Sequence, residues 1–208
     1  MTTKVFDTFT GTNGTDLSAH TPDTDVVGGG WTDSGVNDFE LDGAGAAKAS
    51  AAGDTSWISA GTPTQRVSTN WTAGGADNRM SIFARFDGNL ASPTAYVFNI
   101  RPNASTIQLS KVVAGTTTAL GTNSSYTMSV SSTYLIELEV IGTAIKAYID
   151  SVEEFSVTDS AISTGNYGAI KHELRTNANA RFNDFTIDDT LSGAAPLYFN
   201  HLMKMHNG

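Results

Sequence analysis

The sequence predicts an all-β protein built from antiparallel strands. The clearest evidence is the stretch 134–150, where two runs of alternating residues flank Gly142 and Thr143. A period of two is typical of half-buried strands, and a short polar link that contains glycine predicts a hairpin. Similar short runs recur along the chain between turns rich in Gly and Asp. No helical pattern interrupts them, which excludes a parallel βαβ architecture and favours a sandwich or barrel.

The other expected strands are short, and each carries β-branched or aromatic residues. In chain order, the strands are 4–9, 36–41, 45–50, 55–60, 65–71, 79–86, 95–100, 106–113, 117–120, 134–141, 145–150, 153–157, 167–174 and 181–187. Segment 10–30 is a long loop rich in Gly, Thr and Asp, and 159–162 is expected to form one helical turn. Turn residues around Asp42 and Gly43 predict a hairpin between 36–41 and 45–50.

Two strands allow their faces to be assigned from the alternation. In strand 79–86, the residues expected on one face are Met80, Ile82, Ala84 and Phe86, and those on the other are Arg79, Ser81, Phe83 and Arg85. In strand 134–141, the residues expected to face the core are Tyr134, Ile136, Leu138 and Val140. The intervening Glu137 and Glu139 then lie on an outer face, because successive side chains of a strand point to opposite sides.

Composition narrows the classes of partner. Of 208 residues, 39% are hydrophobic, which is enough for one large all-β domain. The 12 basic residues are spread singly against 21 acidic ones, for a net charge of −9, so nucleic acid and anionic membranes are not expected partners. The chain has no cysteine, which excludes disulfides and thiolate metal sites.

The sequence predicts neither a secretory signal peptide nor a membrane-spanning segment. The segment Met1–Phe6 lacks an apolar region, so no secretory signal peptide is predicted. No run approaches the roughly 18 apolar residues that a membrane span requires.

The C-terminal residues differ in character from the rest. We expect a sandwich domain over 1–190 and a linker with an apolar tail, helical or extended, over 191–208. Pro196 suits the first position of a helix. The tail residues expected to dock on a partner are Leu197, Tyr198, Phe199, Leu202, Met203 and Met205. An exposed apolar patch usually marks an interaction site, so the tail predicts contact with a second subunit or a fold back over its own domain.

The order of several segments resembles the concanavalin A-like lectin/glucanase superfamily, which includes laminin-G-like domains. These segments are 81–87, 95–100, 107–116, 134–150, 157–170 and 182–187. The resemblance covers most of residues 4–188. It implies a jelly-roll sandwich of two antiparallel sheets, one concave and one convex, with both termini in neighbouring strands. Such domains occur as glycan-binding modules, as glycosidases and in phage virion proteins, and the fold alone does not choose among them.

The resemblance implies a pair of acidic residues as the candidate catalytic site. Glycosidases of the superfamily carry a Glu-X-Asp-X-X-Glu type of motif, and Glu137-Leu-Glu139 is the nearest match. Residues i and i+2 of a strand lie roughly 6–7 Å apart, close to the spacing of about 5 Å that retaining hydrolysis needs. Ile141 and Gly142 follow, so the third acid is missing. We therefore interpret the two glutamates as part of a solvated outer face.

Aromatic and acidic residues give two further candidate sites. Trp31, Trp57, Trp71 and Tyr96 could stack on sugar rings, although aromatic residues in a sandwich more often pack in the core. Trp71, beside Gly74 and Gly75, is the tryptophan we would select as exposed. Asp7 and Asp184, which the resemblance places in neighbouring strands, are candidate calcium ligands, against an alternative role in capping turns. No other cofactor is expected.

Three functions remain open from the sequence. The first is a non-catalytic structural protein of a phage particle, such as a capsid decoration or tail component, at the virion surface or outside the cell. It would contact other virion proteins or copies of itself. The second is a carbohydrate-binding module, and the third is a glycoside hydrolase. An acidic, cysteine-free sandwich with an apolar C-terminal peptide favours the first.

Overall fold

The computed structural model describes residues 1–35, 39–49, 53–75, 78–174 and 180–189. The expected C-terminal docking residues, 197–205, lie outside this part of the chain. In the described residues two antiparallel sheets pack face to face, so the predicted all-β jelly-roll sandwich is confirmed. None of the helices described has the length and apolar character needed to cross a membrane.

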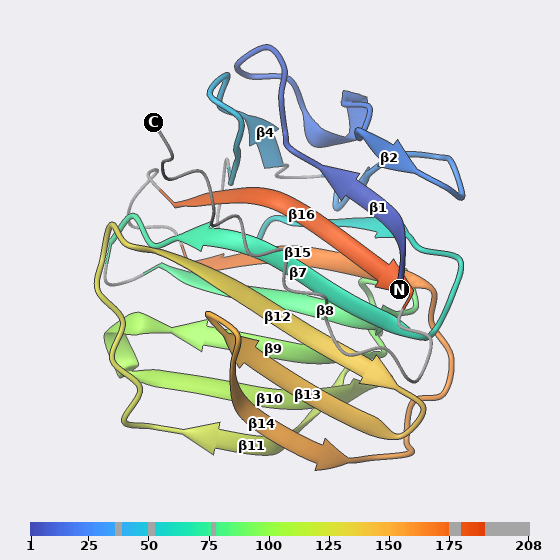
Figure 1. Ribbon diagram of the computed structural model, residues 1–208, viewed down its shortest axis with the longest axis vertical. Coiled ribbons are helices and arrows are strands. Elements are labelled where there is room, and N and C mark those ends of the chain that lie inside the picture. The colour runs from blue at the N-terminus through green and yellow to red at the C-terminus, as the bar shows by residue number, and fades with distance from the viewer. Residues whose placement is uncertain (36–38, 50–52, 76–77, 175–179, 190–208) are drawn as a thin grey trace, which may run out of the picture.

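One sheet forms the front layer in Figure 1. Among the described residues it contains nine strands: in spatial order β14 (Val152–Thr158), β13 (Ala144–Ile149), β12 (Thr133–Ile141), β7 (Gln65–Thr72), β16 (Arg181–Asp189), β1 (Thr2–Asp7) and β2 (Thr24–Asp25), with β5 (Ala47–Ala49) paired to β16 and β4 (Phe39–Leu41) paired to β5. The first and last strands of the described chain, β1 and β16, pair along their length, as the resemblance implied.

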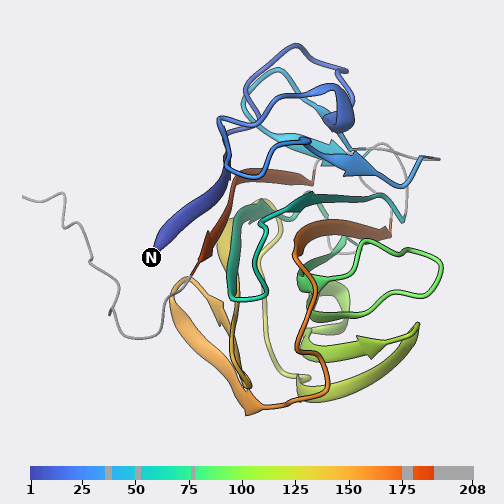
Figure 2. The same ribbon diagram turned by 90° about the vertical axis from the view of Figure 1, so that its right-hand side faces the viewer.

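The second sheet lies behind the first, and on the right in Figure 2. Its seven strands among the described residues are, in spatial order, β11 (Thr116–Asn123), β10 (Thr106–Val113), β9 (Ala95–Arg101), β8 (Arg79–Phe86), β15 (Tyr167–Leu174), β6 (Thr55–Ser59) and β3 (Thr32–Asp33). Two short 3₁₀ turns, η1 (Leu17–Ala19) and η2 (Pro102–Ala104), interrupt the loops.

The central hairpin has the expected structure. Ile141 pairs with Ala144, so Gly142 and Thr143 form a two-residue turn, and Gly142 has a φ of 58°. Glycine suits this position because left-handed backbone carries no Cβ penalty there. Ile136, Leu138 and Val140 are fully buried between the sheets, which confirms the predicted core face.

The segment expected to form a helical turn, 159–162, is an irregular link with a bend at Ala161 instead. The backbone N–H of Asp159 donates to the carbonyl of Thr143, 2.9 Å away, and its carboxylate accepts the N–H of Ala161 at 2.9 Å. An aspartate that binds the backbone two residues onward competes with helix formation, which explains the difference. The same carboxylate accepts hydrogen bonds from Tyr96 Oη at 2.8 Å and Lys111 Nζ at 2.6 Å.

These contacts predict an acid-sensitive contribution to stability. Desolvation alone would raise the pKa of Asp159, but the hydrogen bonds from Lys111, Ala161 and Tyr96 outweigh it and lower the pKa below 3.8. A lowered carboxylate pKa stabilises the fold above the unfolded-state value, and this stability is lost as the pH falls through the folded-state pKa. In urea unfolding, we expect the difference between wild type and Asp159→Asn to be largest near about pH 6 and to shrink towards about pH 3. A difference that is independent of pH would contradict this assignment.

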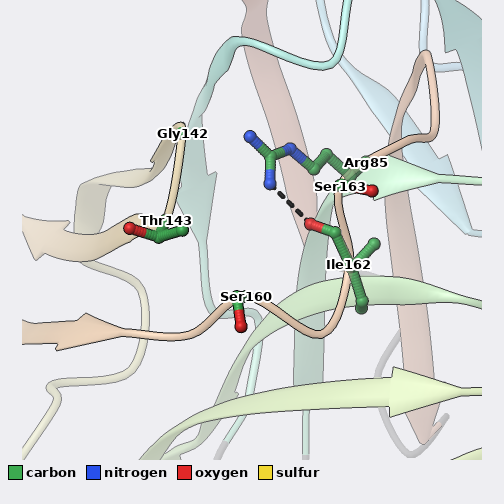
Figure 3. Close-up of a pocket in the computed structure, with 6 residues that line it drawn as sticks. All are labelled: Arg85, Gly142, Thr143, Ser160, Ile162 and Ser163. Carbon is green, nitrogen blue, oxygen red and sulfur yellow. Dashed lines mark hydrogen bonds between the residues drawn. The ribbon is translucent and has the colours of Figure 1, made fainter.

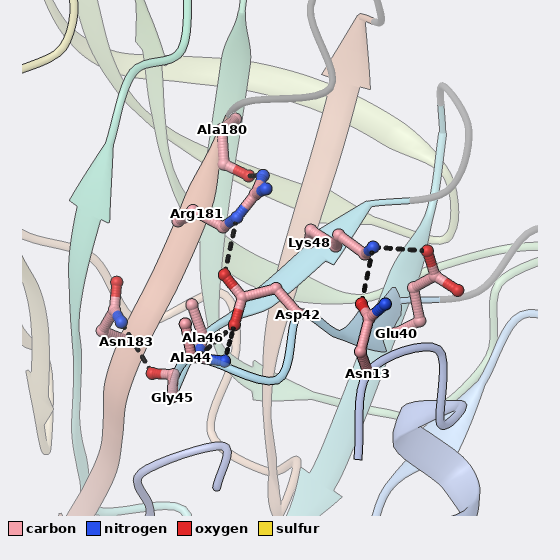
Figure 4. A network of polar contacts seen from close by, with 10 residues as sticks. All are labelled: Asn13, Glu40, Asp42, Ala44, Gly45, Ala46, Lys48, Ala180, Arg181 and Asn183. Carbon is pink, nitrogen blue, oxygen red and sulfur yellow. Dashed lines mark hydrogen bonds and ion pairs between the residues drawn. The ribbon is translucent and has the colours of Figure 1, made fainter. Parts of the chain in front are cut away.

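A polar network fixes the short β4–β5 hairpin to the sandwich (Figure 4). Arg181 Nε donates to Asp42 Oδ2 at 2.8 Å, and Asn183 Nδ2 donates to the carbonyl of Gly45 at 2.7 Å. Lys48 Nζ lies 3.1 Å from Glu40 Oε1 and donates to Asn13 Oδ1 at the same distance. The predicted hairpin around Asp42 is thereby confirmed, and β16 holds it in place.

Candidate functional site

The outer face of the seven-stranded sheet carries a band of hydrogen-bonded polar side chains. Ser81 on β8 pairs with Asn99 on β9 and with Lys171 on β15, so the side chains of these residues share that face. Glu173 lies at a register shift near the end of β15, and its carboxylate reaches this face, where it accepts a hydrogen bond from Ser81. Two strands consecutive in the chain, β8 and β9, therefore meet here with β15, which lies far along the sequence.

Glu173 and Asn99 form the centre of this band. Glu173 Oε1 accepts hydrogen bonds from Asn99 Nδ2 at 2.7 Å and from Ser81 Oγ at 2.9 Å. Asn99 Nδ2 also donates a hydrogen bond to Ser81 Oγ at 2.8 Å. Asn99 Oδ1 accepts a hydrogen bond from Arg101 Nε at 2.7 Å. The carboxylate, the amide and the guanidinium thus hold one another in a fixed geometry, with charge-assisted bonds at both ends.

The band continues across β10 to the edge of the sheet. Gln108 Oε1 accepts a hydrogen bond from Ser110 Oγ at 3.3 Å, and Gln108 Nε2 donates one to Thr122 Oγ1 at 3.0 Å. Gln108 pairs with Asn99 on one side and with Thr122 on the other, so these residues lie in one row. The row runs across β15, β8, β9, β10 and β11.

An aromatic cluster lies beside the polar band, towards the other end of the same strands. The ring of Trp57 on β6 meets Phe86 edge to face at 5.7 Å between centroids, and Phe83 meets Phe86 at 5.8 Å. Tyr167, on β15, packs against the cluster. Trp57 and Phe83 keep 8% and 9% of their surface exposed, whereas Phe86 is buried.

A β-bulge in β8 builds this cluster and corrects the predicted faces of the strand. Tyr167 pairs with Phe86 and Ala169 with Phe83, so two residues of β8, Ala84 and Arg85, stand opposite Gly168 alone. Arg85 takes a φ of 52°, which reverses the alternation beyond it. Phe86 therefore joins Phe83 on the outer face, and Arg85, expected outside, turns towards the interior.

Several polar atoms on this face remain available to a ligand. Glu173 Oε2, the terminal nitrogens of Arg101 and the indole nitrogen of Trp57 make no hydrogen bond with the residues that the structure describes. Arg101 and Glu173 are half-buried. The face thus offers one acceptor oxygen and three donor nitrogens, next to apolar rings.

Of the four aromatic residues predicted to stack on sugars, only Trp57 lies on this face. Trp71, which we selected as exposed, is 0% exposed in the core, and this expectation was wrong. Trp71 shares the parity of the buried Val67 along β7, which places its indole between the sheets. Trp31 is buried and donates from Nε1 to Asp7 Oδ2 at 2.7 Å, and the buried Tyr96 donates to Asp159.

Glu137 and Glu139 lie on the outer face of the other sheet, as predicted, but Arg66 occupies the space between them. Arg66 Nη2 is 2.7 Å from Glu137 Oε1, and Nη1 is 3.8 Å from Glu139 Oε2. The guanidinium also lies over the ring of Tyr148, at 5.4 Å from its centroid. Glu137 is consequently buried instead of solvated.

The charge of Arg66 is strongly retained in this arrangement. Burial alone would lower the pKa of Arg66, but the adjacent Glu137 and Glu139 outweigh it and raise the pKa. Arg66 thus stands between the two carboxylates, where a glycosidase would place the scissile bond of its substrate. The pair therefore has the arrangement of an ion-pair network.

The two calcium candidates lie in neighbouring strands, but their carboxylates are not brought together. Asp7 is fully buried, and its oxygens accept the N–H of Phe9 at 2.7 Å and the indole N–H of Trp31, with His20 Nε2 at 2.9 Å. Asp184 is exposed and accepts Asn70 Nδ2 at 3.0 Å. Among the described residues, no three His, Asp or Glu side chains form a group that could hold a metal ion.

The sequence interpretation missed the residues that form the polar band. The alternation of β9 and β15 does place Asn99 with Arg101, and Lys171 with Glu173, on common faces. It does not show that β8 separates these two strands, because 66 positions lie between Arg101 and Gly168 in the sequence and nothing local specifies the pairing. The grouping of Glu173 with Asn99 and Ser81 is a product of the tertiary fold.

Known structures share this fold, although sequence comparison finds no relative. No family profile matches the sequence, and no curated protein is similar to it. The carbohydrate-binding module CBM66 from Bacillus subtilis aligns with a TM-score of 0.60 and 18% identity, over 76% of this chain and 94% of that one. A β-glucanase from Bacillus licheniformis aligns with a TM-score of 0.61 and 10% identity, over 90% and 98%.

A third structure is the exoplasmic/lumenal domain of VIP36 in its Ca²⁺/Man3GlcNAc-bound form. It aligns with a TM-score of 0.55 and 11% identity, over 80% of this chain and 86% of that one. At such identities the likeness concerns the fold alone. The chain thus has the jelly-roll fold found in galectin-like and concanavalin A-like domains.

Proposed function

We propose that this protein binds a glycan on the outer face of its seven-stranded sheet. The observation that carries the proposal is the hydrogen-bonded array of Glu173, Asn99 and Arg101 beside the aromatic cluster of Trp57 and Phe83. A sugar ring presents hydroxyl groups at its edge and C–H groups on its faces. Binding sites commonly combine an apolar surface with a few fixed polar groups that set the orientation of the ligand.

Two fold neighbours are consistent with this proposal. One is described as a carbohydrate-binding module, and another is described as the Ca²⁺/Man3GlcNAc-bound form. The three structures compared above do not bear on a phage particle, so the virion role expected from the sequence gains no support from them.

We expect binding without hydrolysis. Within the described strands of the seven-stranded sheet, Glu173 is the only acidic residue whose carboxylate joins the polar band on the outer face. Both mechanisms of glycoside hydrolysis commonly use two carboxyl groups on opposite sides of the scissile bond. On the other sheet, Glu137 and Glu139 are held by Arg66.

The test begins with a glycan array and continues with calorimetric titration of the best ligand. Glu173→Gln preserves shape but removes the charge, and Arg101→Ala removes the free donors. Each should weaken binding by about tenfold to a hundredfold, because a hydrogen bond to a charged group contributes about 1.5–3 kcal/mol. Glu139→Gln, on the opposite sheet, is the matched control and should bind as the wild type does.

Three outcomes would contradict the proposal or one of its parts. An array without any bound glycan would reject glycan binding itself. Affinity that is unchanged in Glu173→Gln and Arg101→Ala would place the ligand elsewhere on the molecule. Release of reducing sugar from the bound glycan, abolished in Glu137→Gln, would show that the protein is a hydrolase.

A further inference from the structure

The bulge that moves Phe86 outwards also places an arginine inside the end of the sandwich. Arg85 is 3% exposed and lines a pocket of about 260 Å³ (Figure 3). The other lining residues are Gly142, Thr143, Ser160, Ile162 and Ser163. They come from the β12–β13 turn and from the link that leads from β14 to β15, so both sheets contribute to the pocket.

Among the described residues, the guanidinium of Arg85 is held by neutral carbonyl groups. Nε donates to the carbonyl of Pro63 at 2.7 Å, and Nη1 donates to the carbonyl of Ile162 at 2.6 Å. No described carboxylate forms an ion pair with it. The carboxylate of Asp159, in the link that lines the pocket, is already engaged by Lys111 and Tyr96. A buried charge without a counter-ion is costly, and native proteins normally pair such charges.

Donors of Arg85 remain unused at the pocket. A guanidinium has five N–H donors in a fixed fork, and only those on Nε and Nη1 find partners among the described residues. In Figure 3 the second terminal nitrogen lies on the side of the guanidinium away from Ile162. Burial lowers the pKa of Arg85, and Tyr96 offsets this only in part.

The backbone around Arg85 is fixed, so the fork is preorganised. The N–H of Arg85 donates to the side chain of Gln65, which is itself fully buried, at 2.9 Å. A Cβ on Gly165, where φ is +105°, would lie 2.1 Å from the carbonyl oxygen of Arg85. The link 159–166 therefore packs directly against β8, and a non-glycine left-handed residue such as Arg85 is a strained feature that often accompanies function.

We propose that this pocket binds a small oxyanion, a carboxylate or a sulfate group, with Arg85 as its charged ligand. The second terminal nitrogen of Arg85 carries two N–H donors, and a hydrogen bond from a guanidinium to an anionic oxygen is strengthened by the charges on both partners. The net charge of the chain is −9, so anions are repelled from the surface in general, and saturable binding would identify a local site. The inference does not depend on glycan binding at the outer face, which lies on the other side of β8.

The test uses the side-chain Nε–H signals of arginine in NMR spectra of the full-length protein. The signal missing from Arg85→Gln identifies Arg85. Sodium sulfate and sodium acetate, added at constant ionic strength, should shift this signal saturably and leave that of Arg66 unchanged. Glucuronate tests the same chemistry carried by a sugar, and glucose, which lacks the carboxylate, should cause no shift.

A blocking variant keeps the test valid if Arg85→Gln does not fold. Thr143 is exposed in the β12–β13 turn, so Thr143→Trp should fill the pocket without disturbing the sheet. We expect it to weaken anion binding at least about tenfold, since it excludes the anion from a charge-assisted hydrogen bond. Ala144→Trp, on the outer face of the neighbouring strand, is the matched control and should bind as the wild type does.

Each result of the titration identifies a source of the oxyanion or rejects the site. A saturable shift with glucuronate but not with acetate or sulfate would identify an acidic sugar as the source of the oxyanion. A shift with all three would identify a general oxyanion site. The absence of a saturable shift with any of them, or binding that survives in Thr143→Trp, would overturn the proposal and leave Arg85 as a structural residue.

Discussion

Truncation of Leu138 to alanine is expected to lower the free energy of unfolding by roughly 2–5 kcal/mol. Leu138 is fully buried on β12, where it pairs with Val67 on one side and Ala147 on the other. The cost combines the lost transfer of the side chain from water with the cavity that remains, and neighbouring strands limit collapse into that cavity.

Glu139, the next residue along β12, is the matched control for Leu138. It lies on the outer face, 3.8 Å from Arg66, and its replacement by alanine should change stability by no more than about 0.5 kcal/mol. Urea denaturation of both variants, followed by tryptophan fluorescence, compares the two costs directly. A larger cost for Glu139→Ala than for Leu138→Ala would mean that the two faces of β12 are assigned the wrong way round.

Replacement of Asp7 with asparagine should destabilise the protein by about 3 kcal/mol, despite nearly identical shape. A carboxylate can only accept hydrogen bonds. One oxygen of Asp7 accepts the hydrogen bond from the N–H of Phe9, and the other accepts the one from the indole N–H of Trp31. In either orientation, the amide NH₂ of asparagine would face one of these donors. Because Asp7 is fully buried, that donor would lose its acceptor at a position with no access to bulk solvent.

Asp184→Asn provides the comparison for Asp7. Asp184 is exposed, accepts a hydrogen bond from Asn70 and has a φ of 50°, a backbone conformation that asparagine also tolerates. We therefore expect a change within about 0.5 kcal/mol. Thermal unfolding of both variants, measured at the same pH, compares the change in stability caused by Asp184→Asn with that caused by Asp7→Asn. Equal effects at the two positions would show that the buried network around Asp7 contributes nothing particular to stability.

The candidate sites illustrate how far a sequence pattern reaches. Alternation along β12 correctly separates Leu138 from Glu137, because the pleat fixes the side of every second residue. It leaves open what covers the outer side. Glu137 is buried there because Arg66, 71 positions away in the sequence, stacks on Tyr148 and binds the carboxylate.

The bulge at Arg85 shows a second limit. The strict alternation of 79–86 predicts Phe86 with Met80 and Arg85 with Ser81, and a regular strand would satisfy both assignments. The extra residue arises only where β8 meets Gly168 of β15, and Gln65 of β7 fixes the backbone N–H at that point. One local irregularity thus decides both the aromatic surface on the outer face and the charged pocket inside.

The sequence by itself determined the all-β class, the β12–β13 hairpin with its Gly142–Thr143 turn, and the buried face of β12. These properties depend on residues that are close along the chain, where hydrophobic period and turn chemistry act directly. The tertiary structure alone decided that Glu173, Asn99 and Ser81 meet, that Trp71 lies inside while Trp57 lies outside, and that Arg85 is buried with no ion-pair partner among the described residues. Each of these depends on pairing between strands distant in sequence, and such pairing is set by the packing of the whole sandwich.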